Sequence, residues 1–313
     1  IDCGISKKDF MARCADAGFD PTRIEAVLVT HEHTDHTKGL GVVLRGLAKL
    51  GAHPTIYANP ATSAASKPLQ EIAETHLVLP FGTDALSVRS TDLEIAGMRI
   101  FPFGTSHDAA ASFGFRIECD GDALGFMTDS GIVTPAAHEA LQDVRLLALE
   151  CNHDSRMLER GPYPFMVKQR IASDRGHLSN DQASDELTAL LSNRLEAVAA
   201  MHISENNNEY DLALKTFTET LARGALRSRV LRLPRTSDRR RINPALHYLR
   251  KKHSIQCIEC FSSAVIYPSL PEPIPRPQHR QDRPHRRCAR CACSCSSMNV
   301  YRRTAPSNRS RTA

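Results

Sequence analysis

The feature that most constrains this chain is a cluster of polar residues directly behind an apolar run. In the stretch AVLVTHEHTDHTKGL, residues 26–40, three histidines and two acidic residues occupy six consecutive positions. The run before them, IEAVLVT (24–30), is continuous and β-branched, as in a strand that is buried on both faces. Polar groups gathered at the end of such a strand carry a large desolvation cost unless they have partners. A divalent cation would remove that cost, and the stretch therefore predicts a metal site.

The spacing within the cluster fits a shared ligand. Residues i and i+2 of an extended segment point the same way, so His31, His33 and Asp35 can face one spot. The apolar spacing over residues 40–50 predicts a helix. His36 stands at the start of this helix, from where its side chain can face the same spot. The alternative is a solvated turn with ordinary surface histidines. It accounts for a single histidine better than for the whole H-x-H-x-D-H pattern.

Residues 1–233 alternate short apolar runs with helical patterns, which predicts an α/β sandwich. We expect hairpins over 93–103 and 112–128, the second turning at Asp120-Gly121-Asp122, and buried strands over 145–150 and 195–203. Ser179 and Gln182 are spaced as a capping box for a helix that continues through Leu191.

Further polar residues stand at or just past the predicted ends of these strands. They are His107, Asp129, His153 and His202. Strand ends on one edge of a sheet converge in space, and α/β folds bind ligands at that edge. The scattered residues therefore form one candidate site together with the cluster at 31–36.

Charge divides the chain near residue 233. The net charge of the whole chain is +5, but residues 234–313 hold 17 Lys and Arg against 4 Asp and Glu, a net of +13. That leaves residues 1–233 with 23 against 31, a net of −8. Residues 234–313 also hold 9 of the 18 prolines, so they bury too little apolar surface to offset the entropy of ordering. We expect a globular domain over 1–233 and a low-complexity, basic, Pro/Arg/Cys-rich tail over 234–313.

Two C-x2-C pairs in the tail, Cys257/Cys260 and Cys288/Cys291, have the outline of a zinc ribbon. The stretch between them is rich in proline and arginine, and no strand pattern frames either pair. A basic nucleic-acid-binding tail is a second alternative. We favour a disordered or frame-shifted end.

The remaining patterns exclude several classes of protein. No apolar run approaches the roughly 18 residues of a membrane span, and the first residues lack a signal pattern, so we expect a cytoplasmic protein without a membrane partner. The chain begins at Ile1 in what reads as the end of a strand, and we expect it to lack upstream residues. Neither a G-x-x-x-x-G-K nor a G-x-G-x-x-G motif occurs, so no nucleotide cofactor is expected.

The pattern HEHTDH resembles the metallo-β-lactamase superfamily, and later residues match that superfamily in order. The resemblance covers about residues 1–233 and implies an αββα sandwich, with a first hairpin that should precede Ile1 apparently missing. It also implies a buried aspartate behind the metals at Asp2 of DCG, which orients ligating imidazoles. The implied metal ligands are His31, His33, Asp35, His36, His107, Asp129 and His202.

Several stretches are similar to one branch of the superfamily, the WalJ (YycJ) group. They are SHDA, LECNHD, YPFMVKQRIASDRGHLSN and HISENNN. This resemblance implies 5′-to-3′ exonuclease activity on double-stranded DNA. The form HISENNN stands where the branch would have one like HLSRENN, so an arginine that could contact phosphate is absent.

The resemblance implies two divalent ions, Zn²⁺ or Mn²⁺, and a metal-bridging hydroxide as the nucleophile. His31, His33 and His107 would hold one ion and Asp35, His36 and His202 the other, with Asp129 between them.

Other residues are candidates for contact with the substrate. Asp35 would orient the hydroxide, and His177 of GHLSN would assist the leaving oxygen; for His177 a capping or surface role is equally open. His153 either lines the site or is structural. Lys168 and Arg170 either bind phosphate or belong to a solvated helix face.

Three functions remain open. The first is a dinuclear metal-dependent phosphodiesterase acting on DNA, although the −8 charge of residues 1–233 is unusual for a duplex binder. The second is a metal-dependent hydrolase of a small-molecule ester, thioester or lactone, in which the basic residues of 152–180 would be idle. The third is a non-catalytic nucleic-acid-binding protein that acts through the tail. The oligomeric state does not follow from the sequence.

Overall fold

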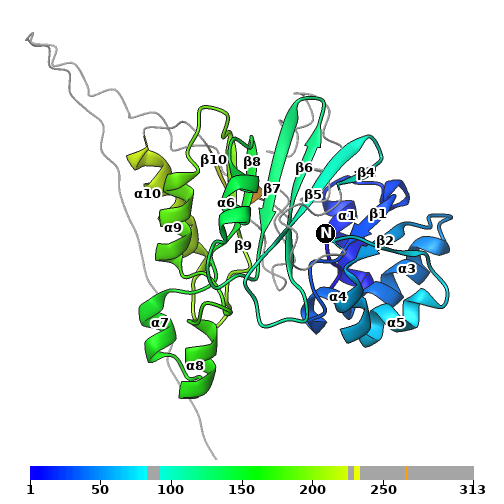
Figure 1. Cartoon of the computed structure of the whole chain (residues 1–313), viewed down its shortest axis with the longest axis horizontal. Coiled ribbons are helices and arrows are strands. Elements are labelled where there is room, and N and C mark those ends of the chain that lie inside the picture. Colours follow the sequence, from blue (N-terminus) through cyan, green and yellow to red (C-terminus); the bar gives the residue numbers. More distant parts are fainter. Residues whose placement is uncertain (83–91, 225–228, 233–264, 267–313) are drawn as a thin grey trace, which may run out of the picture. The chain divides into compact units, whose positions relative to one another are not determined.

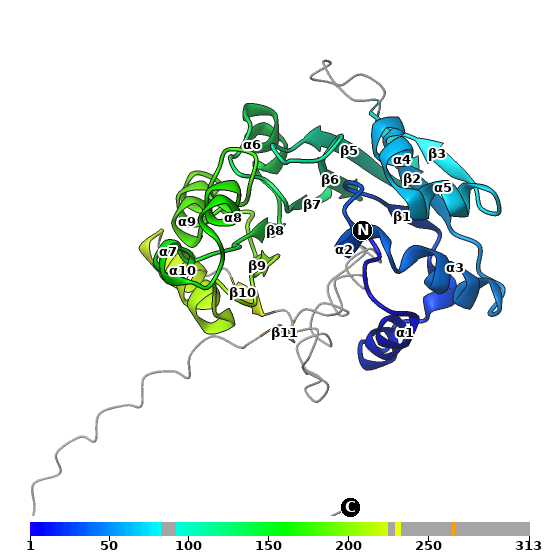
Figure 2. The same cartoon turned by 90° about the horizontal axis from the view of Figure 1, so that it is seen from below.

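A computed structural model of the chain describes residues 1–82, 92–224, 229–232 and 265–266. Within them, two β-sheets pack face to face, and helices cover the outer face of each sheet (Figures 1 and 2). The predicted αββα sandwich is confirmed. No helix of these residues is long and apolar enough to span a membrane.

The smaller sheet consists of parallel strands in the order β1-β2-β3. These strands are β1 (Ala26–Leu28), β2 (Thr55–Ala58) and β3 (Val78–Pro80). The helical elements of this half are α1 (Lys7–Asp16), η1 (Pro21–Arg23), α2 (Thr34–Thr37), α3 (Leu40–Ala48), α4 (Pro60–Ala65) and α5 (Lys67–Ala73). The apolar face of α3 packs on the sheet through Leu40, Leu44 and Leu47, as its predicted spacing requires.

The larger sheet has the strand order β11-β10-β9-β8-β7-β6-β5-β4. Its strands are β4 (Leu93–Ile95), β5 (Met98–Gly104), β6 (Phe113–Cys119), β7 (Asp122–Met127), β8 (Leu146–Glu150), β9 (Ala197–Met201), β10 (Arg229–Arg232) and β11 (Val265–Ile266). Strands β4 to β7 pair antiparallel, and β7 to β10 pair parallel. The helices of this half are α6 (Pro135–Leu141), α7 (Ser155–Arg160), α8 (Phe165–Ile171), α9 (Asn180–Ala189) and α10 (Tyr210–Arg223).

Local signals in the sequence account for several boundaries. Asp120 and Gly121 both have positive φ, 50° and 75°, which makes the tight turn of the β6–β7 hairpin. The capping box of Ser179 and Gln182 is formed at the start of α9, as predicted. Helix α9 ends at Ala189, two residues before the predicted end at Leu191.

The topology brings the candidate site to one edge of the larger sheet. Strands β5, β7, β8 and β9 run in the same direction, so their carboxyl ends lie together. An apolar core between the sheets, which includes Leu28, Phe115 and Phe126, holds β1 against this sheet. The loop that follows β1 is thereby placed beside the ends of the four strands.

The predicted division at residue 233 stays a prediction. Among the residues after it, the structure describes β11, which pairs antiparallel with β10. The four cysteines of the zinc-ribbon alternative lie outside the described residues.

Candidate metal centre

The segment Asp2-Cys3-Gly4 fixes the loop that follows β1. The amide of Asp2 donates to the Leu28 carbonyl at 2.7 Å, and the amide of Cys3 donates to the His36 carbonyl at 2.8 Å. A Cβ on Gly4 would lie 1.3 Å from the carbonyl oxygen of Asp35, so only glycine fits at this position. The DCG motif therefore clamps both ends of the histidine-rich loop.

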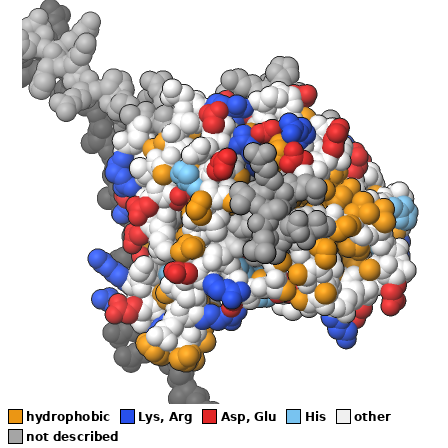
Figure 3. All heavy atoms as spheres, viewed as in Figure 1, with side chains coloured by type: hydrophobic (Ala, Val, Ile, Leu, Met, Phe, Trp, Pro, Cys, Tyr) orange, Lys and Arg blue, Asp and Glu red, His pale blue; other side chains and the backbone are white. Residues whose placement is uncertain are grey.

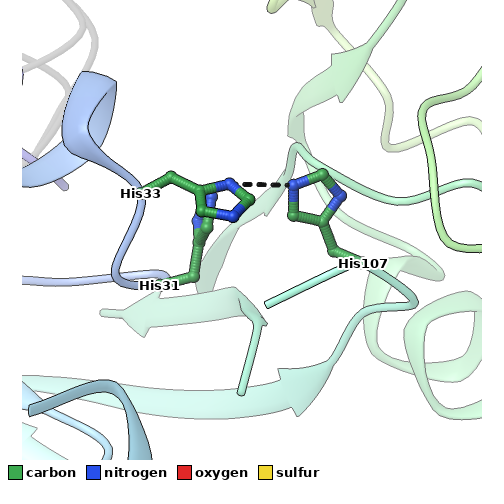
Figure 4. Close-up of side chains that lie close together, drawn as sticks. All are labelled: His31, His33 and His107. Atoms are coloured by element: carbon green, nitrogen blue, oxygen red, sulfur yellow. Dashed lines mark hydrogen bonds between the residues drawn. The ribbon is translucent and has the colours of Figure 1, made fainter. Parts of the chain in front are cut away.

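We call His31, His33 and His107 the first donor group. Their ligand atoms lie within 4.8 Å of one another. His33 Nδ1 and His107 Nε2 are 3.3 Å apart (Figure 4). His31 and His107 are buried.

We call Asp35, His36 and His202 the second donor group. Asp35 Oδ2 lies 3.5 Å from His36 Nε2 and 3.8 Å from His202 Nε2. Asp129 stands between the groups: its Oδ1 lies 3.3 Å from His202 Nε2 and 3.8 Å from His107 Nε2. Asp35 is exposed, so the centre is open to solvent where Asp35 lies.

The donor atoms fit divalent cations. Ligands at about 2.0–2.1 Å from a tetrahedral zinc ion are about 3.3 Å apart, close to the separations found here. The buried atoms without a hydrogen-bond partner among the described residues include His31 Nε2 and Asp129 Oδ2 of this centre. Buried polar atoms normally have partners, and a cation would supply one to each.

Asp2 orients the imidazoles from behind. One of its oxygens accepts hydrogen bonds from His36 Nδ1 and from the Thr30 hydroxyl, both at 2.8 Å. Thr30 Oγ1 lies 2.9 Å from His31 Nδ1. Since the hydroxyl proton goes to the carboxylate, Thr30 accepts from His31 Nδ1–H, which leaves Nε2 without a proton and able to bind a metal ion.

Glu150 orients two more imidazoles, and it is not among the site residues that the sequence predicts. This fully buried residue ends β8, and its Oε1 accepts from His177 Nδ1 at 2.8 Å and from His202 Nδ1 at 3.1 Å. Its Oε2 accepts from the amides of Ser130 and Leu178. The available signal was an acidic residue at the end of an otherwise apolar strand, LLALE, whose five residues are all buried.

The structure places His177 beside the centre. Its ring centroid lies 4.9 Å from that of His107 and 5.1 Å from that of His202. A Cβ on Gly176 would come within 2.1 Å of the Ile171 carbonyl oxygen, so glycine is required in the tight turn that leads from α8 to His177. His177 and His202 also line a cavity of about 930 Å³.

His153 lies beneath this loop instead of facing the cavity. It is 3% exposed, and its carbonyl accepts from the Asn180 amide at 2.8 Å. Burial lowers the pKa of His153 to about 4, so the ring is neutral. The residue supports the turn between His177 and α9.

Lys168 and Arg170, the predicted phosphate contacts, both have partners within the protein. Lys168 Nζ donates to the Glu159 carbonyl at 2.7 Å. Arg170 forms an ion pair with Asp108, the residue after His107. Arg175 donates to the His107 carbonyl at 3.0 Å. The Lys168 contact ties α8 to α7, and the contacts of Arg170 and Arg175 tie α8 and the turn after it to the loop that carries His107.

Three residues of the centre hold left-handed backbone conformations. The φ angles of Asp2, Asp129 and His202 are 54°, 57° and 52°. Such conformations are uncommon for residues other than glycine and persist where the surrounding structure enforces them, often at functional sites.

The two donor groups differ in electrostatics. Burial and the neighbouring charge of His36 lower the pKa of His31, and burial lowers that of His107. Burial opposes the charged form of His36 as well, but the Asp2 carboxylate outweighs it and raises the pKa of His36 to about 10. His202 is likewise buried, yet Asp129 and its other carboxylate neighbours raise its pKa.

Comparison with known proteins agrees with this geometry. A family model described as the beta-lactamase superfamily domain matches residues 1–203. The exodeoxyribonuclease WalJ of Streptococcus pneumoniae is 33% identical over 231 residues, which are 72% of this chain and 81% of that protein. The exodeoxyribonuclease YycJ of Bacillus anthracis is 31% identical over 223 residues, 71% of this chain and 80% of that protein.

Solved structures show the same fold. The metallo-β-lactamase fold protein YhfI of Bacillus subtilis has a TM-score of 0.52 and 19% identity, covering 70% of this chain and 79% of its own. The short form of human tRNase Z has a TM-score of 0.50 and 17% identity, covering 65% of this chain and 81% of its own.

The chain belongs to the beta-lactamase superfamily and, within its metallo-β-lactamase-fold members, to the WalJ-like branch. It is accordingly a metal-dependent hydrolase, and its His/Asp cluster is the place for divalent metal ions.

Proposed function

We propose that the protein is an exonuclease that hydrolyses phosphodiester bonds of double-stranded DNA. The observation that carries this proposal is the meeting of two metal-donor groups with the His177–Glu150 pair at one sheet edge. Relatives named exodeoxyribonuclease, 31–33% identical over about 70% of the chain, support DNA as the substrate.

Two divalent ions would be held by the two donor groups, with Asp129 shared between them. Bound there, they would lower the pKa of a water molecule toward neutrality and polarise a phosphate oxygen. Three imidazoles in the first group suit zinc, and the carboxylate of Asp35 makes the second group suitable for zinc or manganese.

The chain's own side chains have separate tasks in this reaction. Asp35, exposed at the mouth of the centre, accepts a hydrogen bond from the attacking water and orients it toward phosphorus. His177 donates a proton from Nε2 to the leaving oxygen, since its Nδ1 is engaged by Glu150. The Glu150 carboxylate accepts from Nδ1 and fixes the orientation of that ring.

Charge near the centre favours a polyanionic substrate. Residues 1–233 carry a net charge of −8, yet residues 155–171, which span α7 and α8, hold four basic residues against one acidic residue. This net of +3 lies on the segment that leads into His177. Lys168 and Arg170 of this segment have partners within the protein, which leaves the exposed Arg156 and Arg160 to meet a polyanion.

The test is degradation of a 5′-labelled duplex by the full chain with Mn²⁺ or Zn²⁺, beside Asp35→Ala. Asp16→Ala, an exposed carboxylate on α1, is the matched control. We expect cleavage by the wild type and by the control and none by Asp35→Ala, which would also exclude action through the tail alone. A folded, metal-loaded wild type that leaves DNA intact but hydrolyses small esters would overturn the proposal.

A further inference from the structure

Helix α8 exposes apolar side chains to an unusual degree. Phe165, Met166 and Val167, consecutive at its start, are 69%, 72% and 36% exposed. Within the part of the chain that the structure describes, none of the seven residues of α8 is buried. Figure 3 shows hydrophobic side chains at the lower tip of the molecule, where α8 lies, with Lys and Arg side chains nearby.

This exposure calls for a partner. A helix of seven residues is marginal by itself, and protein helices are normally stabilised by packing of an apolar face. Consecutive exposed large apolar residues mark interaction sites on soluble proteins. The start of α8 therefore has the character of a binding surface.

The other end of α8 is fixed to the metal centre. Arg170 pairs with Asp108, and His107 Nδ1 bonds to the Gly176 carbonyl at 3.1 Å. Whatever binds the start of α8 is thus held by a short, anchored element that leads directly into His177. Figure 1 shows α7 and α8 projecting beyond the ends of the strands.

The positive charge around the start of α8 indicates which kind of partner binds there. The apolar residues lie in the segment of net charge +3 noted above, with Lys168 on the next position and Arg156 and Arg160 on α7. A second copy of the chain bound symmetrically through α8 would bring two such segments together, and like charges in contact repel. A polyanion that also presents flat apolar surfaces fits both properties, and a nucleic acid with unpaired bases is such a molecule.

We propose that Phe165 and Met166 pack against the bases at the frayed or single-stranded end of a DNA substrate, while the exposed Arg156 and Arg160 of α7 face its phosphates. This inference rests on the proposed nuclease function and names the substrate feature that the enzyme would recognise. Because aromatic stacking tolerates every base, the contact would favour strand ends without selecting a sequence.

The test uses the full chain and a phosphorothioate-protected duplex whose single-stranded end carries 2-aminopurine. Stacking on Phe165 should quench the fluorescence of this base. In Phe165→Ala/Met166→Ala we expect the quenching to disappear and Kd to rise about tenfold or more, and Phe165→Trp should retain both. Leu50→Ala/Leu77→Ala, which removes two other exposed apolar side chains, should change neither.

Hydrolysis of bis(4-nitrophenyl) phosphate, which has no bases, reports on the metal centre and should be unchanged in every variant. Unchanged quenching and Kd in Phe165→Ala/Met166→Ala would overturn the inference, as would a dimer that this variant converts to a monomer. Wild type that binds and quenches the DNA but cannot cleave it would count against the proposed function alone.

Discussion

The two donor groups of the metal centre are built differently. In the first group, the imidazoles of His31 and His107 are oriented by neutral partners, the Thr30 hydroxyl and the Gly176 carbonyl. In the second group, His36 and His202 are oriented by carboxylates, Asp2 and Glu150. The first group is therefore oriented by uncharged partners, and the second is polarised from behind by carboxylates.

This difference predicts which substitutions behind the imidazoles should lower metal affinity or activity most. A carboxylate behind a ligating imidazole raises its basicity and fixes its tautomer, and loss of such a partner typically lowers metal affinity or activity. The second group depends on two such carboxylates, and one of them, Glu150, also holds His177. Changes behind the second group should therefore matter more than changes behind the first.

The largest effect is expected for Glu150→Gln. The amide keeps the shape of the side chain but cannot accept at both oxygens, so His177 and His202 lose a common anchor. General acid catalysis contributes about 10²–10⁴-fold, and we expect kcat for DNA cleavage to fall by that order. Single-turnover cleavage at saturating metal measures it.

Glu186→Gln is the matched control, because Glu186 also forms a hydrogen bond with a histidine. Its Oε1 lies 2.8 Å from Nδ1 of His138, which is not part of the metal centre. It should retain full activity. Full activity in Glu150→Gln, with the protein folded, would show that the carboxylate behind the second group has no part in the reaction.

The absence of Glu150 from the sequence-based site has a physical reason. The H-x-H-x-D-H residues share one loop, so local spacing predicts that their side chains lie together. The αββα architecture follows equally from periodicity, as the β6–β7 hairpin and the helical spacing of α3 show. Glu150 acts through partners 27 and 52 residues away in sequence, His177 and His202. The pairing of β8 with β9 brings Glu150 to His202, and hydrogen bonds between Leu178 and the end of β8 bring it to His177.

A smaller effect is expected for Asp2→Asn. Asparagine tolerates the positive φ at this position, but its amide would place a donor against His36 Nδ1 or Thr30 Oγ1 and favour the wrong tautomer of His36. We expect metal affinity of the second group to fall about 10–100-fold, with the first group less affected. Calorimetric titration of the metal-free protein measures both steps, with Asp16→Asn as control. Equal weakening of the two steps would contradict the comparison.

The same variant predicts a change in the pH dependence of stability of the metal-free protein. Asp2 raises the pKa of His36 from 6.5 to about 10, so this group's stabilisation is fully present below pH 6.5 and is lost as the pH rises through 10. Wild type should lose stability over this window, and Asp2→Asn should lose less. Urea unfolding in EDTA across the window measures the two slopes, and parallel slopes would refute the assignment of Asp2 as the cause.

The smallest effect is expected for Thr30→Val, which acts behind the first group. Valine matches the shape of threonine but removes the hydroxyl that links Asp2 to His31. His36 keeps its direct bond to Asp2, so the second group should bind metal as before. We expect metal affinity of the first group to fall by less than about tenfold, the low end for partners of ligating histidines. A fall in metal affinity as large as that of Asp2→Asn would contradict this expectation. It would mean that Asp2 acts on the metal centre through the Thr30 hydroxyl and not through its direct bond to His36.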